Sequence, residues 1–160
     1  MCDGPLTFST AQCKTPIMTE FLVGTWSLVA WRRIAEDGRV SYPLGEDARG
    51  LLSYTDNGRM AVQISGAKRA EQDASDPLGG HERDRAQAYS TYLAYYGTFE
   101  VRGQQVAHRI EASLYQNWAG ETQVRPYTFS SGQLVLRTSP TRLGDGSTVV
   151  NELAWKREPR

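Results

Sequence analysis

The sequence predicts an all-β protein, an eight-stranded antiparallel up-and-down barrel that carries one accessory α-helix. Three observations lead to this prediction. Segments of alternating apolar residues recur along the chain, as half-buried strands require. Short turns rich in Gly, Asn and Ser join most of these segments, and only residues 81–96 have a helical period. A flat-sheet α+β fold is the alternative that this pattern leaves open.

The first half of the chain supplies a helical turn, one long strand and a hairpin. The turn is expected over residues 19–24, and the strand over residues 25–34. The hairpin pairs residues 49–55 with residues 59–65 around Asp56-Asn57-Gly58, whose Asn and Gly accept positive φ. In that pairing one face of the hairpin is apolar, formed by Leu52, Tyr54, Met60, Val62 and Ile64.

The second half begins with a loop over residues 66–80 and a helix over residues 81–96. Tyr89, Leu93 and Tyr96 recur there at three- and four-residue spacing, and Gly97 is expected to end the helix as a positive-φ cap. Further strands are expected at 98–101, 105–113, 123–129, 134–138 and 148–156. Closing eight such strands into a barrel removes the exposed edges and leaves room for one small ligand.

Composition excludes several classes of function. The 18 Lys and Arg balance the 18 Asp and Glu, so an electrostatic nucleic-acid partner is not expected. No apolar run reaches the 18 residues that a membrane span needs. Two Cys and two His form a four-ligand site only if all four converge, so no metal is expected, and without a phosphate-binding or dinucleotide motif no cofactor is expected either. The positive signal is aromatic: four Trp, eight Tyr and four Phe.

Residues 1–17 are predicted to be a flexible N-terminal extension, and residues 18–160 to form the barrel domain. The extension contains both cysteines, Cys2 and Cys13, and lacks the basic and apolar blocks of a secretory signal. No glycosylation sequon is present, so a cytoplasmic location is expected.

Several motifs resemble those of a known family. Gly24-Thr-Trp26 resembles the G-x-W entry of the lipocalins, and Tyr42 to Gly45, Ala48 to Met60, Leu93 to Glu100 and Asn117-Trp118 resemble the lipocalin-like domain family of bacterial and fungal proteins. The resemblance covers about residues 20–157 and implies a small ligand-binding barrel, with Trp26 and Trp155 as floor residues. Arg109 departs from it, because the family often has a second His there.

Candidate catalytic residues follow from the expected pairing of residues 105–113 with residues 123–129. If Ser113 lies opposite Gln123, then Glu111 faces Arg125 and Arg109 faces Tyr127. This polar face is either solvated or lines the lumen, where an Arg125–Glu111 pair would bind a carbonyl, enol or carboxylate. His108, on the opposite face, is the core histidine and a candidate general acid or base. Tyr95 is a candidate proton donor.

The remaining candidates are expected to bind a ligand rather than react with it. They are polar or aromatic residues near the expected lumen or its rim: Tyr54, Gln63, Tyr96, Arg109, Ser113, Trp118 and Tyr127.

The function predicted from the sequence is binding of a small, largely hydrophobic metabolite, with cofactor-free isomerase, cyclase or lyase activity in specialised metabolism. A non-catalytic carrier or sensor is the alternative, and homodimer formation is left open. No nucleophile elbow, phosphate loop or dinucleotide fingerprint is present, so triad hydrolysis and nucleotide chemistry are not expected.

Overall fold

The computed structural model of the chain describes residues 17–159. The predicted extension over residues 1–17 therefore lies, apart from Ile17, outside the described residues, and so do both cysteines. The helices among the described residues are α1 (Ile17–Leu22), α2 (Glu82–Ser90) and the 3-10 helix η1 (Gln116–Trp118). None of them has the length and hydropathy needed to cross a bilayer.

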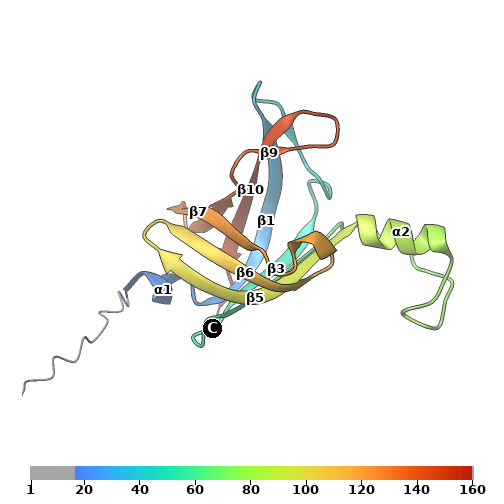
Figure 1. Cartoon of the computed structure of the whole chain (residues 1–160), viewed down its shortest axis with the longest axis horizontal. Coiled ribbons are helices and arrows are strands. Elements are labelled where there is room, and N and C mark those ends of the chain that lie inside the picture. The colour runs from blue at the N-terminus through green and yellow to red at the C-terminus, as the bar shows by residue number, and fades with distance from the viewer. Residues whose placement is uncertain (1–16, 160) are drawn as a thin grey trace, which may run out of the picture.

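Ten strands of the described part of the chain form one antiparallel sheet, and eight of them close into the predicted barrel (Figure 1). The closed strands run in chain order, and β1 pairs with β10 to complete the ring, while β2 and β9 are short additions. The strands are β1 (Gly24–Ala35), β2 (Val40–Ser41), β3 (Arg49–Tyr54), β4 (Arg59–Ser65), β5 (Tyr92–Arg102), β6 (Gln105–Ser113), β7 (Thr122–Ser130), β8 (Gln133–Arg137), β9 (Thr141–Arg142) and β10 (Thr148–Arg157).

The β3–β4 hairpin has the predicted register. Leu52 pairs with Val62 and Tyr54 with Met60, and these side chains are buried in the barrel, whereas Leu51 on the other face is exposed. Alternation with a period of two therefore identified the inner face correctly in these two strands.

The predicted helix over residues 81–96 is wrong in its second half. Helix α2 ends at Ser90, and Tyr92 already begins β5, whose residues 92–98 pair with β4. Tyr95 is buried in the barrel while Tyr96 beside it is exposed, which is strand alternation. The helical spacing of the tyrosines and Leu93 was coincidental, because aromatic residues favour a pleated surface that can pair with a neighbour.

Gly97 is correspondingly not a helix cap. It lies at a β-bulge where β5 meets β6, and a Cβ atom placed on it would lie 1.9 Å from the carbonyl oxygen of Arg109. Glycine is needed here for the close approach of two backbones, which is a different role from accepting positive φ.

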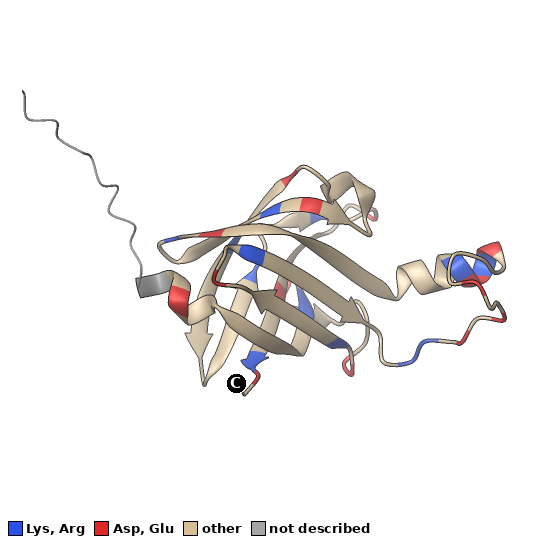
Figure 2. Cartoon of the chain, turned by 90° about the horizontal axis from the view of Figure 1, so that it is seen from below, with Lys and Arg blue, Asp and Glu red and all other residues tan. Residues whose placement is uncertain are grey.

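Residues 66–91 project from the barrel between β4 and β5 (Figures 1 and 2). Helix α2 buries none of its residues, and charges of both signs alternate along its first turns. The barrel core is therefore built without α2.

One end of the barrel is closed by α1. The indole of Trp26 is buried there and donates to the carbonyl oxygen of Leu22 at 2.9 Å, while the guanidinium of Arg157 lies 4.1 Å from the centre of its ring. This geometry agrees with the predicted floor position of Trp26. The opposite end is open.

Candidate ligand-binding site

A cavity of about 510 Å³ occupies the open end of the barrel, within the range of small-molecule pockets. Six of the eight barrel strands contribute residues to it, because alternate side chains of a barrel strand face the lumen. Its walls are mainly aliphatic and aromatic. The lining residues that matter below are Trp31 and Arg33 (β1), Tyr95 (β5), Trp118 (η1), Gln123 and Arg125 (β7), and Asn151, Leu153 and Trp155 (β10).

Arg125 is a buried cation on the cavity wall. Only 9% of the residue is exposed, and its guanidinium donates to the Oε1 atom of Gln123. None of the ion pairs among residues 17–159 includes Arg125. Its positive charge therefore lacks a carboxylate counter-ion in the described part of the chain.

His108 lies outside the cavity lining, in a buried network with two tyrosines. The hydroxyl of Tyr54 lies 2.6 Å from Nε2 of His108, and the hydroxyl of Tyr95 lies 3.3 Å from Nδ1. A neutral imidazole has one N–H donor and one acceptor nitrogen, so one tyrosine donates to the ring and the other accepts from it. Tyr95 links this network to the cavity, which it lines.

Burial determines the protonation states in this network. Desolvation, with a smaller effect of the Arg125 charge, lowers the pKa of His108 to about 3. Desolvation also raises the pKa of Tyr54 well above its usual value and raises that of Tyr95, although Arg125 opposes both shifts. At neutral pH the network therefore contains a neutral imidazole and two neutral phenols, and the positive charge of Arg125 acts on all three groups.

The predicted pairing of Glu111 with Arg125 is wrong. Arg125 lies opposite Val106, and Gln123 lies opposite His108. The observed register of β6 and β7 differs from the expected one by five positions, and an odd shift exchanges the two faces of a strand. Arg125 therefore shares the inner face with His108, whereas Arg109 and Glu111 lie on the outer face. The shift arises because β7 begins opposite Arg109. The residues of β6 after Arg109 pair with β5 and not with β7, and η1 follows them.

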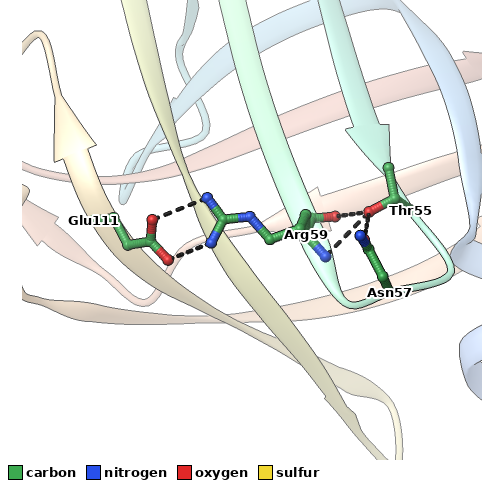
Figure 3. A network of polar contacts seen from close by, with 4 residues as sticks. All are labelled: Thr55, Asn57, Arg59 and Glu111. Carbon is green, nitrogen blue, oxygen red and sulfur yellow. Dashed lines mark hydrogen bonds and ion pairs between the residues drawn. The ribbon is translucent and has the colours of Figure 1, made fainter.

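On the outer face Glu111 has a different partner (Figure 3). Its carboxylate accepts two hydrogen bonds from the guanidinium of Arg59, at 2.5 and 2.9 Å. The Thr55 hydroxyl donates to Asn57 at 2.6 Å and accepts from the backbone N–H of Arg59 at 3.1 Å, which orders the turn before β4. The hydrogen bonds from Arg59 also lower the pKa of Glu111, so this carboxylate is ionised and faces solvent rather than the lumen.

Five other predicted ligand-binding residues lie away from the cavity. Gln63 and Tyr96 are exposed on the outer face, and the Gln63 side chain accepts a hydrogen bond from Tyr92. Ser113 is half-buried and accepts from the backbone N–H of Tyr115, while Tyr127 is buried and donates to the carbonyl oxygen of Gly103 at 3.0 Å. Tyr54 is buried next to His108, below the lining.

Trp118, Tyr95 and Arg125 are the predicted site residues that line the cavity. Trp118 packs edge-on against Tyr95, with ring centres 5.7 Å apart, so the loop after β6 contributes to the cavity wall. Trp155, predicted as a floor residue, also lines the cavity, and its indole Nε1 has no hydrogen-bond acceptor among the described residues.

Sequence reasoning missed the contribution of β1 and β10 to the site. Arg33 lines the cavity and donates to the Oδ1 atom of Asn151 at 3.2 Å, and Trp31 donates to the same atom at 3.0 Å. A bulge after Leu28 shifts the alternation of β1, so Trp31 and Arg33 lie on the inner face with Leu28 rather than opposite it. Without the partner strand, nothing in the local sequence reveals that bulge.

Among residues 17–159 no group of three or more His, Cys, Asp or Glu side chains is arranged to hold a metal ion.

An eight-stranded barrel with one closed end and an apolar cavity at the other defines the lipocalin-like class of binding folds. Residues 23–158 match the lipocalin-like domain family, and the chain belongs to that family. This confirms the resemblance that its motifs indicate.

Two further comparisons concern individual proteins. The 4'-hydroxy-3'-methoxypropiophenone carrier protein ppsC of Aspergillus oryzae is 29% identical over 109 residues, which cover 63% of this chain and 98% of that protein. The crystal structure of an N57Q mutant of the fluorescent protein UnaG is similar with a TM-score of 0.38 and 16% identity, covering 88% of this chain and 98% of the other. That structural similarity is too low to inform function.

Proposed function

We propose that the protein binds a small, largely hydrophobic metabolite in the open end of the barrel and acts as its carrier. The observation that supports this most directly is the cavity of about 510 Å³ with mainly apolar walls. Removing an apolar molecule from water into such a cavity is favourable in proportion to the area buried. The ligand of the Aspergillus oryzae relative, an aryl ketone by its name, has the same character.

The polar groups of the cavity orient the ligand. Tyr95, Gln123 and Arg125 place a hydroxyl, an amide and a guanidinium along one side, against the apolar surface formed by residues such as Leu153 and Trp155. A few convergent polar groups in an apolar pocket are typical of sites that select one orientation of a ligand.

A cofactor-free isomerase, cyclase or lyase is the second candidate. The observation that favours it is the contact between the Tyr95 hydroxyl, in the cavity wall, and His108. Because the pKa of His108 is about 3, the imidazole holds no extra proton to donate at neutral pH, and Tyr95 would be the group that transfers a proton to or from a substrate.

The cytoplasmic location and the formation of a homodimer remain predictions from the sequence.

Fluorescence titration with N-phenyl-1-naphthylamine, a neutral probe that brightens in apolar surroundings, tests the binding proposal. We expect micromolar affinity and competition by 4'-hydroxy-3'-methoxypropiophenone. The Leu153→Trp variant, which fills the cavity, should weaken binding of the probe at least tenfold. Leu51→Trp, on the exposed outer face of β3, is the matched control and should bind like the wild type.

Absence of probe binding to the folded wild type, or equal binding by both variants, would refute the cavity as the binding site. The same samples separate the two candidate functions. A carrier returns the ketone unchanged after prolonged incubation, as judged by chromatography and mass spectrometry, whereas an isomerase, cyclase or lyase yields a new species that the Tyr95→Phe variant no longer produces.

A further inference from the structure

The charged side chains that line the cavity are all of one sign. Among residues 17–159, Arg33 and Arg125 line the cavity, whereas no Asp, Glu, Lys or His does. The whole chain, by contrast, has 18 basic and 18 acidic residues. The positive charge of the cavity is therefore a local property of the site and does not reflect the composition of the chain.

Several other arginines of the barrel have carboxylate partners. On the outer face Arg32 and Arg137 both bind Glu152, at 2.5 Å each, and Arg59 binds Glu111. Neither Arg33 nor Arg125 forms an ion pair with any of residues 17–159. Each has a neutral amide oxygen as its acceptor instead, from Asn151 and Gln123 respectively.

Burying a cation with only neutral partners costs free energy, because neutral groups do not make up for the hydration that the charge loses. Arg125 is 91% buried, as its exposed fraction of 9% shows. Its field reaches the neighbouring groups, since its charge contributes to lowering the pKa of His108 and opposes the rise in the pKa of Tyr95. Partial burial also lowers the pKa of Arg33. Both cations are thus placed where an anion would stabilise them.

We propose that the ligand is an organic anion, with a carboxylate or an ionised phenol or enol that binds the Arg125 guanidinium and an apolar body that fills the cavity. Arg33 adds a second positive charge on the cavity wall. A guanidinium binds an anionic oxygen through short, charge-assisted hydrogen bonds that a neutral ligand cannot form. This inference rests on the proposed function, that the cavity holds a small molecule, and specifies the chemical class of that molecule.

Two fluorescent probes with the same apolar body test the inference without any mutation. 8-Anilinonaphthalene-1-sulfonate carries a permanent negative charge, and N-phenyl-1-naphthylamine is its neutral counterpart. We expect the wild type to bind the anion at least tenfold more tightly, and Leu153→Trp to weaken binding of both. Equal affinities for the two probes would overturn the anion proposal while leaving cavity binding intact. Binding of neither probe would refute both proposals.

Variants that each lack one arginine show which residues cause the preference for the anionic probe. Arg125→Gln and Arg33→Gln should each weaken binding of the anionic probe at least tenfold and change the affinity for the neutral probe less than threefold. Arg109→Gln removes the same charge from the exposed outer face of β6 and is the matched control. If both cavity variants bind the anionic probe like Arg109→Gln, the arginines do not bind the anion and the proposal is wrong.

Competition at pH 7 distinguishes the sources of the anionic oxygen. 2-Naphthoate supplies a carboxylate, 2,4-dinitro-1-naphthol is an ionised phenol at this pH, and 1-naphthol is a neutral control of similar size. Displacement of the anionic probe by either anion at least tenfold more effectively than by 1-naphthol supports the proposal and identifies the preferred group. Equal displacement by all three compounds contradicts it.

Discussion

His108 illustrates at the scale of one residue how position determines chemistry. Its side chain is fully buried, and its two ring nitrogens are occupied by the hydroxyls of Tyr54 and Tyr95. An isolated histidine titrates near neutral pH and is a natural acid–base catalyst. Here desolvation favours the neutral ring so strongly that the pKa falls to about 3, and the residue serves as a hydrogen-bonding element of the core.

This shift predicts a loss of stability in mild acid. The unfolded state binds a proton at His108 as the pH falls below about 6.5, whereas the folded state does not until about pH 3, so folding becomes less favourable between those values. Between pH 7 and pH 4.5 we expect the free energy of unfolding to fall by about 2 kcal/mol through this residue alone.

Urea denaturation of the wild type, His108→Gln and His81→Gln at the two pH values measures this contribution. Carboxylates titrate alike in all three proteins, so only His108→Gln should lose less stability on acidification. His81 is exposed beside α2 and serves as the matched control. The same decrease in all three proteins would show that His108 takes up a proton in the folded state.

Strand β5 shows how an element depends on its neighbours. Residues 92–96 have spacings compatible with a helix, yet they form a strand because β4 pairs with all of them and β6 pairs with Tyr95 and Tyr96. This places Tyr95 in the lumen and Tyr96 outside. The local sequence is consistent with either structure, and the free energy of pairing and burial decides between them.

The Gly97→Ala substitution tests this arrangement at the bulge. An added Cβ atom would lie 1.9 Å from the Arg109 carbonyl oxygen, so β5 and β6 must separate. We expect a decrease in the free energy of unfolding of more than about 3 kcal/mol, as for other severe backbone conflicts. Gly144→Ala is the control, because nothing lies within 4 Å of the added atom there, and its effect should stay below about 1 kcal/mol. Similar urea midpoints for the two variants would contradict the close approach.

At the scale of the whole molecule, the barrel and the projecting segment are separable. Ser65 at the end of β4 pairs with Tyr92 at the start of β5, and the backbone N–H of Gly66 donates to the carbonyl oxygen of Thr91 at 3.0 Å. The segment between them leaves and re-enters the barrel at neighbouring points, and its helix buries no residue. The segment should therefore contribute little to the stability of the closed sheet.

Replacing residues 68–90 with a four-residue Gly-Ser linker should accordingly preserve the barrel. A shorter loop also lowers the entropy cost of closing the β4–β5 hairpin. We expect cooperative thermal unfolding with a Tm that falls by no more than about 4 °C, and unchanged affinity for the neutral probe. Circular dichroism melts and fluorescence titration measure both quantities. Non-cooperative melting of the shortened chain would show that the segment is part of the folding unit.

Local pattern was sufficient to predict the eight-stranded class and the β3–β4 hairpin with Tyr54 and Met60 on its inner face, and the resemblance to the lipocalins implied the position of Trp26 at the closed end. These features depend on alternation within a strand, on turn residues such as Asn57 and Gly58, and on motifs whose parts are close in sequence. The same information placed His108, Tyr95, Trp118 and Arg125 among the candidates without showing how they are arranged.

Only the tertiary structure determined which polar side chains share the lumen. Arg125 lies beside Gln123 and the His108 network rather than Glu111, and Arg33, from a strand that a bulge has shifted, lines the same cavity. The physical reason is that successive residues of a strand face opposite sides of the sheet. A displacement of the register by an odd number of residues therefore exchanges lumen and solvent, and the register depends on pairing between segments that are distant in the sequence.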